Sequence, residues 1–594
     1  MTKHAPETDT QSPATRGREF WRSLEELSNS PTFQEWLERE FPSGAAEMRD
    51  PRSRRNFLKL MGASLALASL TGCQFAIKPP QRKIVPYVRQ PEQIIPGKPL
   101  FYATGFVNHG YALGVLAESH EGRPTKIEGN PDHPSSLGAT DTFAQASLLT
   151  MYDPDRSTTV LKGGAASTWQ EFVTGLSGAL PQGGAGLRIL TGTITSPTLQ
   201  ADIQKVLTAF PQARWDQYEP VSSNEAAAGA RLAFGQDVHP VYDFSKANVI
   251  LSLDSDFTAT GVGSVRYARD FADRRRVRRD QRQMNRLYVA EPTPTPTGTI
   301  ADHRLPIRAS QIESLARAVA QALGVAGVVA GNPLSDKESA WAAAVAADLQ
   351  ANNGASLVIA GDHQPAIVHA LAHAINQALG NNGATVNYIA PLETNPGTQT
   401  EALTNLVNEM KGNQVQALII LGGNPVYTSP ADLDFAGALK SVPLSIHHSL
   451  YVDETSSLTT WHLPATHYLE EWGDARGHDG TVTIIQPLIA PLYPETRSAS
   501  EVLNALAGTP DQGGYAALTA YWQGQNLGAN FDQAWRQILH DGFVPNTATP
   551  AANVTVSTDF AAGAPTAPIG DLEIVFRPDP SVDDGFWANN GWLQ

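Results

Sequence analysis

Continuous apolar, β-prone runs recur along the chain, and each run ends in Gly, Asp or Pro before a helical pattern begins. Such runs are typical of strands buried on both faces of a parallel sheet. Ala-rich segments between them suit crossover helices. The runs lie at 188–192, 248–254, 287–292, 356–362 and 417–425, and the Ala-rich segments at 311–323 and 338–350. The pattern predicts an α/β fold class with two doubly wound α/β domains, divided near 324–345, plus a smaller strand-rich N-terminal domain.

The chain has 594 residues, more than one hydrophobic core usually serves. We expect six segments in order. They are an extended N-terminal leader with short amphipathic helices (1–50), a twin-arginine lipoprotein signal (51–73), the strand-rich N-terminal domain (74–185), the first α/β domain (186–335), the second α/β domain (336–510) and a C-terminal segment (511–594). The pattern at the end of this last segment predicts loops with one strand, 572–576.

The predicted signal at 51–73 contains the most specific motifs of the chain. Arg54 and Arg55 precede Phe57, Leu58 and a weakly hydrophobic run that is too short to span a bilayer but fits a signal h-region. The next residues, 70–73, resemble a lipobox, in which the sulfur of Cys73 receives diacylglycerol and the chain is cut before it. These signals predict export by the twin-arginine route and a lipid anchor on the periplasmic, outer face of the cytoplasmic membrane. The alternative is a short buried helix with a chance arginine pair.

The leader before the arginines is longer than export requires. Apolar spacing at 20–27 and 33–37 indicates two short amphipathic helices, the second stopped by Pro42. This stretch is either an inert leader or a docking element for a maturation factor or partner subunits, and the sequence leaves both open.

Composition excludes several classes of function. The net charge of −16 argues against a nucleic-acid partner, because phosphate contacts need a basic face. Cys73 is the single cysteine, which excludes an internal disulfide and any iron–sulfur or zinc site built from several thiolates of this chain. No apolar run approaches the ~20 residues of a membrane-spanning helix.

Short motifs at 121–134, 151–156 and 301–308 give the chain a family likeness. Further matches at 421–425, 453–455, 463–465 and 469–473 follow in the same order. Together they resemble the molybdopterin oxidoreductase superfamily over roughly residues 100–510. The extended leader, the twin arginines and the lipobox are similar to a narrower group, the molybdopterin-like iron–sulfur subunits of alternative complex III, a bacterial respiratory quinol oxidoreductase.

That resemblance implies a molybdopterin-enzyme-like half, which this chain covers, followed by a ferredoxin-like half that holds iron–sulfur clusters. The C-terminal segment would lead to this missing ferredoxin-like part. The implied partners are the ferredoxin-like part, polytopic quinol-binding membrane subunits and multihaem cytochrome c subunits.

The cofactor residues of active superfamily members have no counterpart here. No cysteine lies at 102–116 or at 136–141, so a proximal cluster would lack ligands. The 306–308 motif is followed by Ala309-Ser310-Gln311, without the carboxylate that would bind a guanine. We therefore expect no molybdopterin and no iron–sulfur cluster in this chain, and we assign no catalytic, cofactor-binding or metal residue.

Five histidines lie close together in sequence, and imidazoles at such intervals can bind a metal. The residues between them favour separate strand ends instead, so we expect capping or surface histidines. They are His447, His448, His462, His467 and His478.

Three other features have structural interpretations. The arginine run 274–279, beside Asp270, Asp273 and Asp280, predicts a solvated helix face with ion pairs, or a docking patch for an acidic partner. Glu470 and Glu471 are adjacent and point apart, so they do not form a catalytic carboxylate pair. Gly192 and Gly422-Gly423 sit at strand ends where α/β folds bind ligands, without forming a phosphate-binding motif.

The sequence thus favours a lipid-anchored, cofactor-free structural subunit, or half-subunit, of a respiratory quinol:acceptor oxidoreductase of the alternative complex III type. One alternative is an active molybdopterin-dependent oxidoreductase outside the cytoplasmic membrane. The other is a solute-binding lipoprotein.

Overall fold

The computed structural model describes residues 91–594 apart from 93, 177, 280 and 564–571. The described chain opens with an antiparallel sheet of order β1-β2-β3, formed by β1 (Leu100–Asn108), β2 (Tyr111–His120) and β3 (Arg123–Gly129). His109 and Gly110 make the β1–β2 turn with φ of +46° and +82°, the left-handed conformation that a two-residue hairpin loop needs. Helix α4 (Thr142–Met151) packs beside β3, and the side chain of Asp141 caps its first turn.

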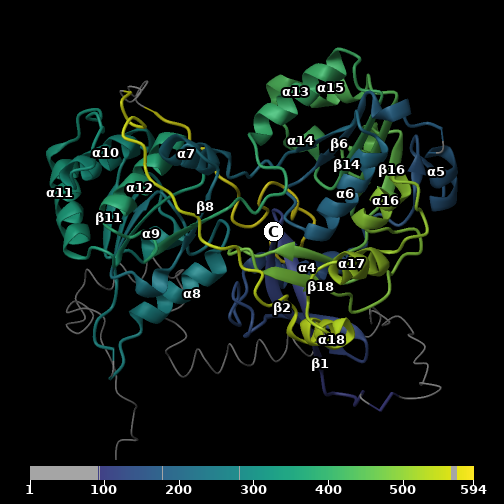
Figure 1. Cartoon of the computed structure of the whole chain (residues 1–594), viewed down its shortest axis with the longest axis horizontal. Helices are drawn as coiled ribbons and strands as arrows, with labels where there is room; N and C mark the ends of the chain where they lie inside the picture. Colours follow the sequence, from purple (N-terminus) through teal and green to yellow (C-terminus); the bar gives the residue numbers. More distant parts are fainter. Residues whose placement is uncertain (1–90, 93, 177, 280, 564–571) are drawn as a thin grey trace, which may run out of the picture. The chain divides into compact units, whose positions relative to one another are not determined.

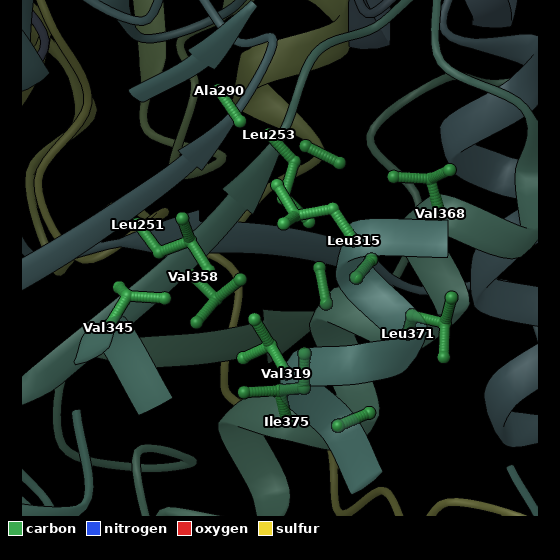
Figure 2. Close-up of a cluster of buried hydrophobic side chains, with 14 of the residues drawn as sticks. Leu251, Leu253, Ala290, Leu315, Val319, Val345, Val358, Val368, Leu371 and Ile375 are labelled. Atoms are coloured by element: carbon green, nitrogen blue, oxygen red, sulfur yellow. The ribbon is translucent and has the colours of Figure 1, made fainter. Parts of the chain in front are cut away.

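A four-stranded parallel sheet of order β11-β10-β9-β12 forms the first α/β layer. Its strands are β9 (Val249–Leu253), β10 (Arg286–Glu291), β11 (His303–Pro306) and β12 (Ser356–Ala360). Side chains alternate between its two faces, as strand geometry requires. Leu251, Leu253 and Val358 point toward α10 (Ile312–Ala322), α11 (Asp336–Ala351) and α12 (Ala366–Ala378), and Figure 2 shows this contact.

The opposite face of the same sheet is also covered. Ile250, Leu287 and Val289 pack with side chains of α7 (Asn224–Phe234) and α8 (Ser264–Arg275), and with a two-stranded antiparallel ribbon of β8 (His239–Tyr242) and β13 (Val386–Ile389). Burial on both faces explains the uninterrupted apolar runs in the sequence.

A second, seven-stranded sheet has the order β5-β4-β16-β15-β14-β6-β7. Its parallel strands are β6 (Leu187–Thr191), β7 (Arg214–Gln217), β14 (Ala417–Leu421), β15 (Leu444–Ser449) and β16 (Trp461–Pro464). The short hairpin of β4 (Leu161–Lys162) and β5 (Ala165–Ala166) extends one edge antiparallel. Helices cover both faces: α5 (Trp169–Leu176), α6 (Pro197–Ala209) and α16 (Ala499–Leu506) on one, α13 (Gln399–Lys411) and α15 (Phe435–Leu439) on the other.

The remaining elements are short. An antiparallel pair of β17 (Gly473–Arg476) and β18 (Val482–Ile485) packs with α17 (Gly514–Gln523) and α18 (Phe531–Asp541). Single-turn helices are α9 (Pro296–Thr299), α14 (Pro425–Thr428), η2 (Gln182–Gly184), η3 (Phe244–Lys246), η4 (Ala309–Gln311), η5 (Ala431–Leu433) and η6 (Ser456–Leu458). Within the described residues, no helix has both the length and the apolar character needed to cross a membrane.

The α/β fold class is confirmed: two doubly wound sheets accompany a smaller, strand-rich N-terminal sheet. Each α/β sheet combines strands from distant parts of the sequence, so the sheets do not follow one another along the chain as separate domains would. β12 pairs with β9 across the boundary expected at 335/336, and β6 pairs with β14 although 225 residues separate their ends. The chain enters the seven-stranded sheet, leaves it to build the four-stranded sheet, and then returns. The predicted domain limits stay predictions, because sheet partners are chosen by long-range packing that local patterns do not carry.

The strand predicted at 572–576 is wrong: this segment has no regular secondary structure and pairs with no described strand. Leu572, Ile574 and Phe576 are 91%, 82% and 84% exposed. The local β pattern is present, but no neighbouring edge of a described sheet completes a ladder.

Candidate functional site

Two crevices lie at the carboxyl ends of the parallel strands, each at the point where the strand order reverses. In the four-stranded sheet this point falls between β9 and β12, and in the seven-stranded sheet between β6 and β14. Open α/β sheets bind ligands at such switch points. We call them the β9–β12 cavity, of about 120 Å³, and the β6–β14 crevice, of about 40 Å³.

The β6–β14 crevice brings together glycines that the sequence placed at separate strand ends. Gly192 follows β6, Gly422 and Gly423 follow β14, and all three line the crevice. The carboxylate of Glu219 approaches Gly192 so closely that a Cβ there would lie 2.4 Å from its Oε1. It accepts a hydrogen bond from the Thr193 backbone N–H at 3.0 Å. Gly192 is therefore required for the approach of this carboxylate.

The C-terminal residues 573–593 run from the carboxyl ends of the four-stranded sheet to the β6–β14 crevice. In Figure 1 the yellow end of the chain passes from beside α7 toward the centre of the view, where the C-terminus is marked. Glu573 accepts hydrogen bonds from the backbone N–H and hydroxyl of Ser310. The Arg577 guanidinium pairs with Asp254, whose fully buried carboxylate also contacts His363 Nε2 at 2.7 Å. We call residues 573–593 the C-terminal strap.

The strap next crosses the β6–β14 crevice and ends on the N-terminal sheet. Asp584 lines this crevice. Trp587 stacks on Phe143 with centroids 5.3 Å apart, and its side chain is almost fully buried. Asn590 donates to the Ala146 carbonyl at 2.9 Å. The strap thus links the ends of both α/β sheets to the N-terminal sheet.

His109 binds the middle of the C-terminal strap. Its Nε2 lies 2.6 Å from Asp583 Oδ2, and its Nδ1 lies 3.4 Å from Glu219 Oε2. Burial by itself would lower the pKa of this residue, His109, but the hydrogen bonds and charges of Asp583 and Glu219 raise it well above its usual value. Burial and the neighbouring carboxylates likewise raise the pKa of Asp584. A protonated imidazole therefore neutralises a carboxylate-rich junction.

We expect His109→Gln to release the distal half of the strap, because glutamine cannot carry the positive charge. A raised histidine pKa stabilises the folded state below the unfolded pKa and loses that effect as pH rises through the folded value, so alkaline pH should act like the substitution. Chymotryptic cleavage after buried Trp587, relative to cleavage after exposed Phe576, measures release by mass spectrometry. His540→Gln, at an exposed histidine, is the matched control. An unchanged ratio in His109→Gln would contradict the role of this ion pair.

The chain is similar to a curated protein and to solved structures. The menaquinone reductase molybdopterin-binding-like subunit of Nitratidesulfovibrio vulgaris is 24% identical over 445 residues, covering 67% of this chain. The match spans 63% of the length of that relative. Acetylene hydratase from Pelobacter acetylenicus matches with a TM-score of 0.49 and 15% identity, over 69% of this chain and 70% of the hydratase. No family model matches the chain.

The similarity to the Nitratidesulfovibrio subunit supports the resemblance to the molybdopterin oxidoreductase superfamily seen in the motifs. The alternative complex III features of the leader fall on residues 1–90, outside the described residues, as do the predicted lipidation site Cys73 and the export-signal residues Arg54, Arg55, Phe57 and Leu58. These stay predictions.

The residues at the two crevices do not fit the molybdopterin dinucleotide that the superfamily implies. Pockets for organic ligands of ordinary size have volumes of roughly 300–1,000 Å³, whereas the crevices here measure about 120 and 40 Å³. Ser310, which follows the 306–308 motif, is occupied by Glu573 of the strap. No cysteine lies among residues 91–594, so the part of the chain that is described offers no thiolate to a metal.

The five clustered histidines are buried, which corrects the expectation of surface or capping residues. His447 and His462 both hydrogen-bond Ser456 Oγ, at 2.8 and 2.9 Å. His448 lies 2.7 Å from the Arg497 carbonyl oxygen, and His467 lies 3.0 Å from Thr150 Oγ1. Burial lowers the pKa of His478 to about 4. They are neutral core residues, and among the described residues no group of three or more His, Cys, Asp or Glu is placed to hold a metal ion.

Glu470 and Glu471 have separate partners, in agreement with the structural interpretation of this pair. Glu470 forms a two-pronged ion pair with Arg156. Glu471 accepts a hydrogen bond from Thr466, and burial raises its pKa to about 8.

The arginine run is only partly a helix face, because α8 ends at Arg275. Arg266 pairs with Asp270 at 2.9 Å, and Arg275 forms a two-pronged ion pair with Asp302. Arg278 and Arg279 follow the helix end and are exposed. The ion pairs of a solvated helix face are therefore present, and the pairing of Arg275 reaches outside the helix.

Sequence reasoning found the glycines of the β6–β14 crevice but missed the residues that line the β9–β12 cavity and the C-terminal strap. Asp362 lies two residues beyond the end of β12, and this place at a strand end could have identified it from the sequence. Nothing local marked His109, His369 or Arg577, because their partners lie more than a hundred residues away or on the backbone of a neighbouring turn.

Proposed function

We propose that this chain is a cofactor-free, lipid-anchored structural subunit of a respiratory quinone or quinol oxidoreductase complex of the alternative complex III type. Similarity to a menaquinone reductase subunit carries the respiratory part of the proposal. That relative is named as a molybdopterin-binding-like subunit of a reductase, which implies a complex with several chains.

The C-terminal strap supports the cofactor-free part. Asp584 of the strap lines the β6–β14 crevice, and Arg577 pairs with Asp254 directly after β9, so both occupy strand ends where α/β folds bind ligands. Glu573 hydrogen-bonds Ser310 beyond β11. Because Glu573 and Arg577 of the strap already bond Ser310 and Asp254, these two side chains are not available to a nucleotide. Electron transfer would then belong to cluster and haem domains of the partners, while this chain positions them.

The location follows from the signal at 51–73. A lipid on Cys73 would anchor the chain at the periplasmic face of the cytoplasmic membrane, beside polytopic quinol-binding subunits, multihaem cytochrome c subunits and a ferredoxin-like iron–sulfur part. The net charge of −16 supports protein partners and argues against nucleic acid.

One preparation tests the proposal. The native complex is purified through an affinity tag on this chain, its Mo and W are measured by mass spectrometry, and its pterin is measured as the oxidised fluorescent derivative. We expect both metals and pterin far below one per chain, and an N-terminal peptide that begins at lipidated Cys73. A known molybdoenzyme carried through the same procedure is the positive control. Stoichiometric Mo or W would overturn the cofactor-free role in favour of an active enzyme, and an unmodified peptide spanning 72–74 would overturn the anchor.

A further inference from the structure

The β9–β12 cavity lies apart from the contacts of the C-terminal strap and contains acidic groups. Asp362 lies two residues beyond the end of β12, lines the cavity and is exposed. Within the described residues it has no hydrogen-bond partner. Glu393 lies on the same cavity and accepts a hydrogen bond from the Tyr111 hydroxyl. Three carboxylates therefore line the cavity, those of Asp237, Asp362 and Glu393.

The cation on the rim of this cavity is already paired. Arg231 Nη1 lies 2.7 Å from Asp237 Oδ1, and both residues line the cavity. His239 also lines it, and burial lowers the pKa of this imidazole, so it is neutral near pH 7. Asp362 and Glu393 thus face the cavity without a counter-ion among the described residues, which favours a positively charged ligand.

A buried imidazole adds a second, independent signal. His369 lines the cavity and is 5% exposed, and its Nε2 has no hydrogen-bond partner within the described part of the chain. Backbone groups of Gly361 and Gln364 hydrogen-bond its ring, and burial lowers its pKa to about 4. With the proton held on the other nitrogen, Nε2 is a free acceptor. An orphaned buried acceptor of this kind costs stability unless a ligand donates to it.

The walls of the cavity are aromatic. His239 stacks on Tyr111 with ring centroids 6.3 Å apart, and Tyr242 meets Tyr267 edge-on at 5.8 Å. Tyr242, Tyr267 and Phe257 all line the cavity. Aromatic faces beside a carboxylate attract organic cations more than strongly hydrated metal ions.

We propose that the β9–β12 cavity binds a small organic cation with a planar amidinium or guanidinium group, anchored by the carboxylate of Asp362 and by Nε2 of His369. A planar N–H fork matches a carboxylate in two-pronged geometry. Size limits the ligand as well: a cavity of about 150 Å³ is known to hold benzene, so a cavity of about 120 Å³ suits a ligand with the dimensions of one ring. This site is independent of the subunit role, because it uses no residue of the strap.

The test titrates benzamidinium chloride into the purified full-length protein by calorimetry, with benzamide as the neutral molecule of the same shape. We expect saturable binding of benzamidinium and none of benzamide. Asp362→Asn should weaken binding about tenfold or more, since it removes the charge that anchors the cation. Asp511→Asn, at an exposed residue outside the cavity, should bind as the unchanged protein does.

The thermal midpoint of each variant shows whether weaker binding results from a loss of folding. Asp362→Asn should keep the thermal midpoint of the unchanged protein, because the carboxylate makes no hydrogen bond within the described residues that the substitution would break. His369→Phe, which removes the free acceptor but keeps an aromatic ring, should also weaken binding. Equal binding of benzamide, undiminished binding by Asp362→Asn, or no saturation by benzamidinium would each overturn the proposal.

Discussion

Glu470→Ala should destabilise the protein by about 3–5 kcal/mol, because it leaves the buried positive charge of Arg156 without its partner. Both side chains of the Arg156–Glu470 pair are fully buried, with Nη2 and Oε2 2.7 Å apart. Glu470 also accepts hydrogen bonds from the backbone N–H groups of His467 and Leu492. Removing the carboxylate leaves the Arg156 guanidinium without its counter-ion and two backbone donors without an acceptor. Urea unfolding followed by tryptophan fluorescence measures the loss.

The exposed pair of Lys126 and Glu128 is the matched control. Their side chains are 54% and 42% exposed, so Glu128→Ala should cost much less than Glu470→Ala. Burial would raise the pKa of Glu470, but the bonds from Arg156 and the backbone lower it. The stabilisation is therefore present above the pKa of the unfolded glutamate and is lost as pH falls through the lower folded value. If Glu470→Ala cost no more than Glu128→Ala, the buried pair would not stabilise the fold more than a surface pair does.

Asp474→Ala should produce the second large effect, about 3 kcal/mol or more, since each buried donor left unpaired costs about 1–3 kcal/mol. The Asp474 carboxylate is 2% exposed. It accepts bonds from the Ser196 hydroxyl, the Thr198 N–H and hydroxyl, and the Trp522 indole N–H, the last at 2.9 Å. These donors come from the first turn of α6 and from α17, so one side chain ties β17 to two helices.

Asp474→Asn should lose less, because the amide oxygen keeps part of the acceptor capacity. Asp511→Ala, at an exposed residue, should leave the urea midpoint unchanged. The intrinsic fluorescence of Asp474→Ala should also change, since Trp522 loses its hydrogen bond. A urea midpoint of Asp474→Ala equal to that of Asp511→Ala would show that β17 does not depend on this carboxylate.

The motifs that carry the superfamily resemblance have structural roles in this chain. Arg156 closes the 151–156 motif and pairs with Glu470 of the 469–473 motif. His133 of the 121–134 motif is buried and lies 2.8 Å from Thr483 Oγ1, and Asn130 of the same motif donates to the Asp541 carbonyl at 2.8 Å. These residues hold the N-terminal sheet to the β17–β18 pair and α18. Similarity at these positions therefore reports a shared framework and does not require a shared reaction.

The sequence by itself determined the elements that follow local rules. Apolar runs marked five of the parallel strands, β6 and β14 of the seven-stranded sheet and β9, β10 and β12 of the four-stranded sheet, because a strand buried on both faces favours apolar side chains throughout. The Ala-rich segments became α10 and α11, close to their expected limits. The twin arginines, the h-region and Cys73 lie together in the chain, and they predict its export route and its lipid anchor.

Only the tertiary structure decided which groups meet. Arg156 and Glu470 lie 314 residues apart in the chain, and Arg577 and Asp254 lie 323 apart, so no periodicity reveals either pair. The same limit explains the histidines: a short polar pattern does not reveal that Ser456 lies inside the core and hydrogen-bonds both His447 and His462. Strand identity is set by side-chain period, but the partner of a strand and the partner of a buried charge are set by packing across the whole fold.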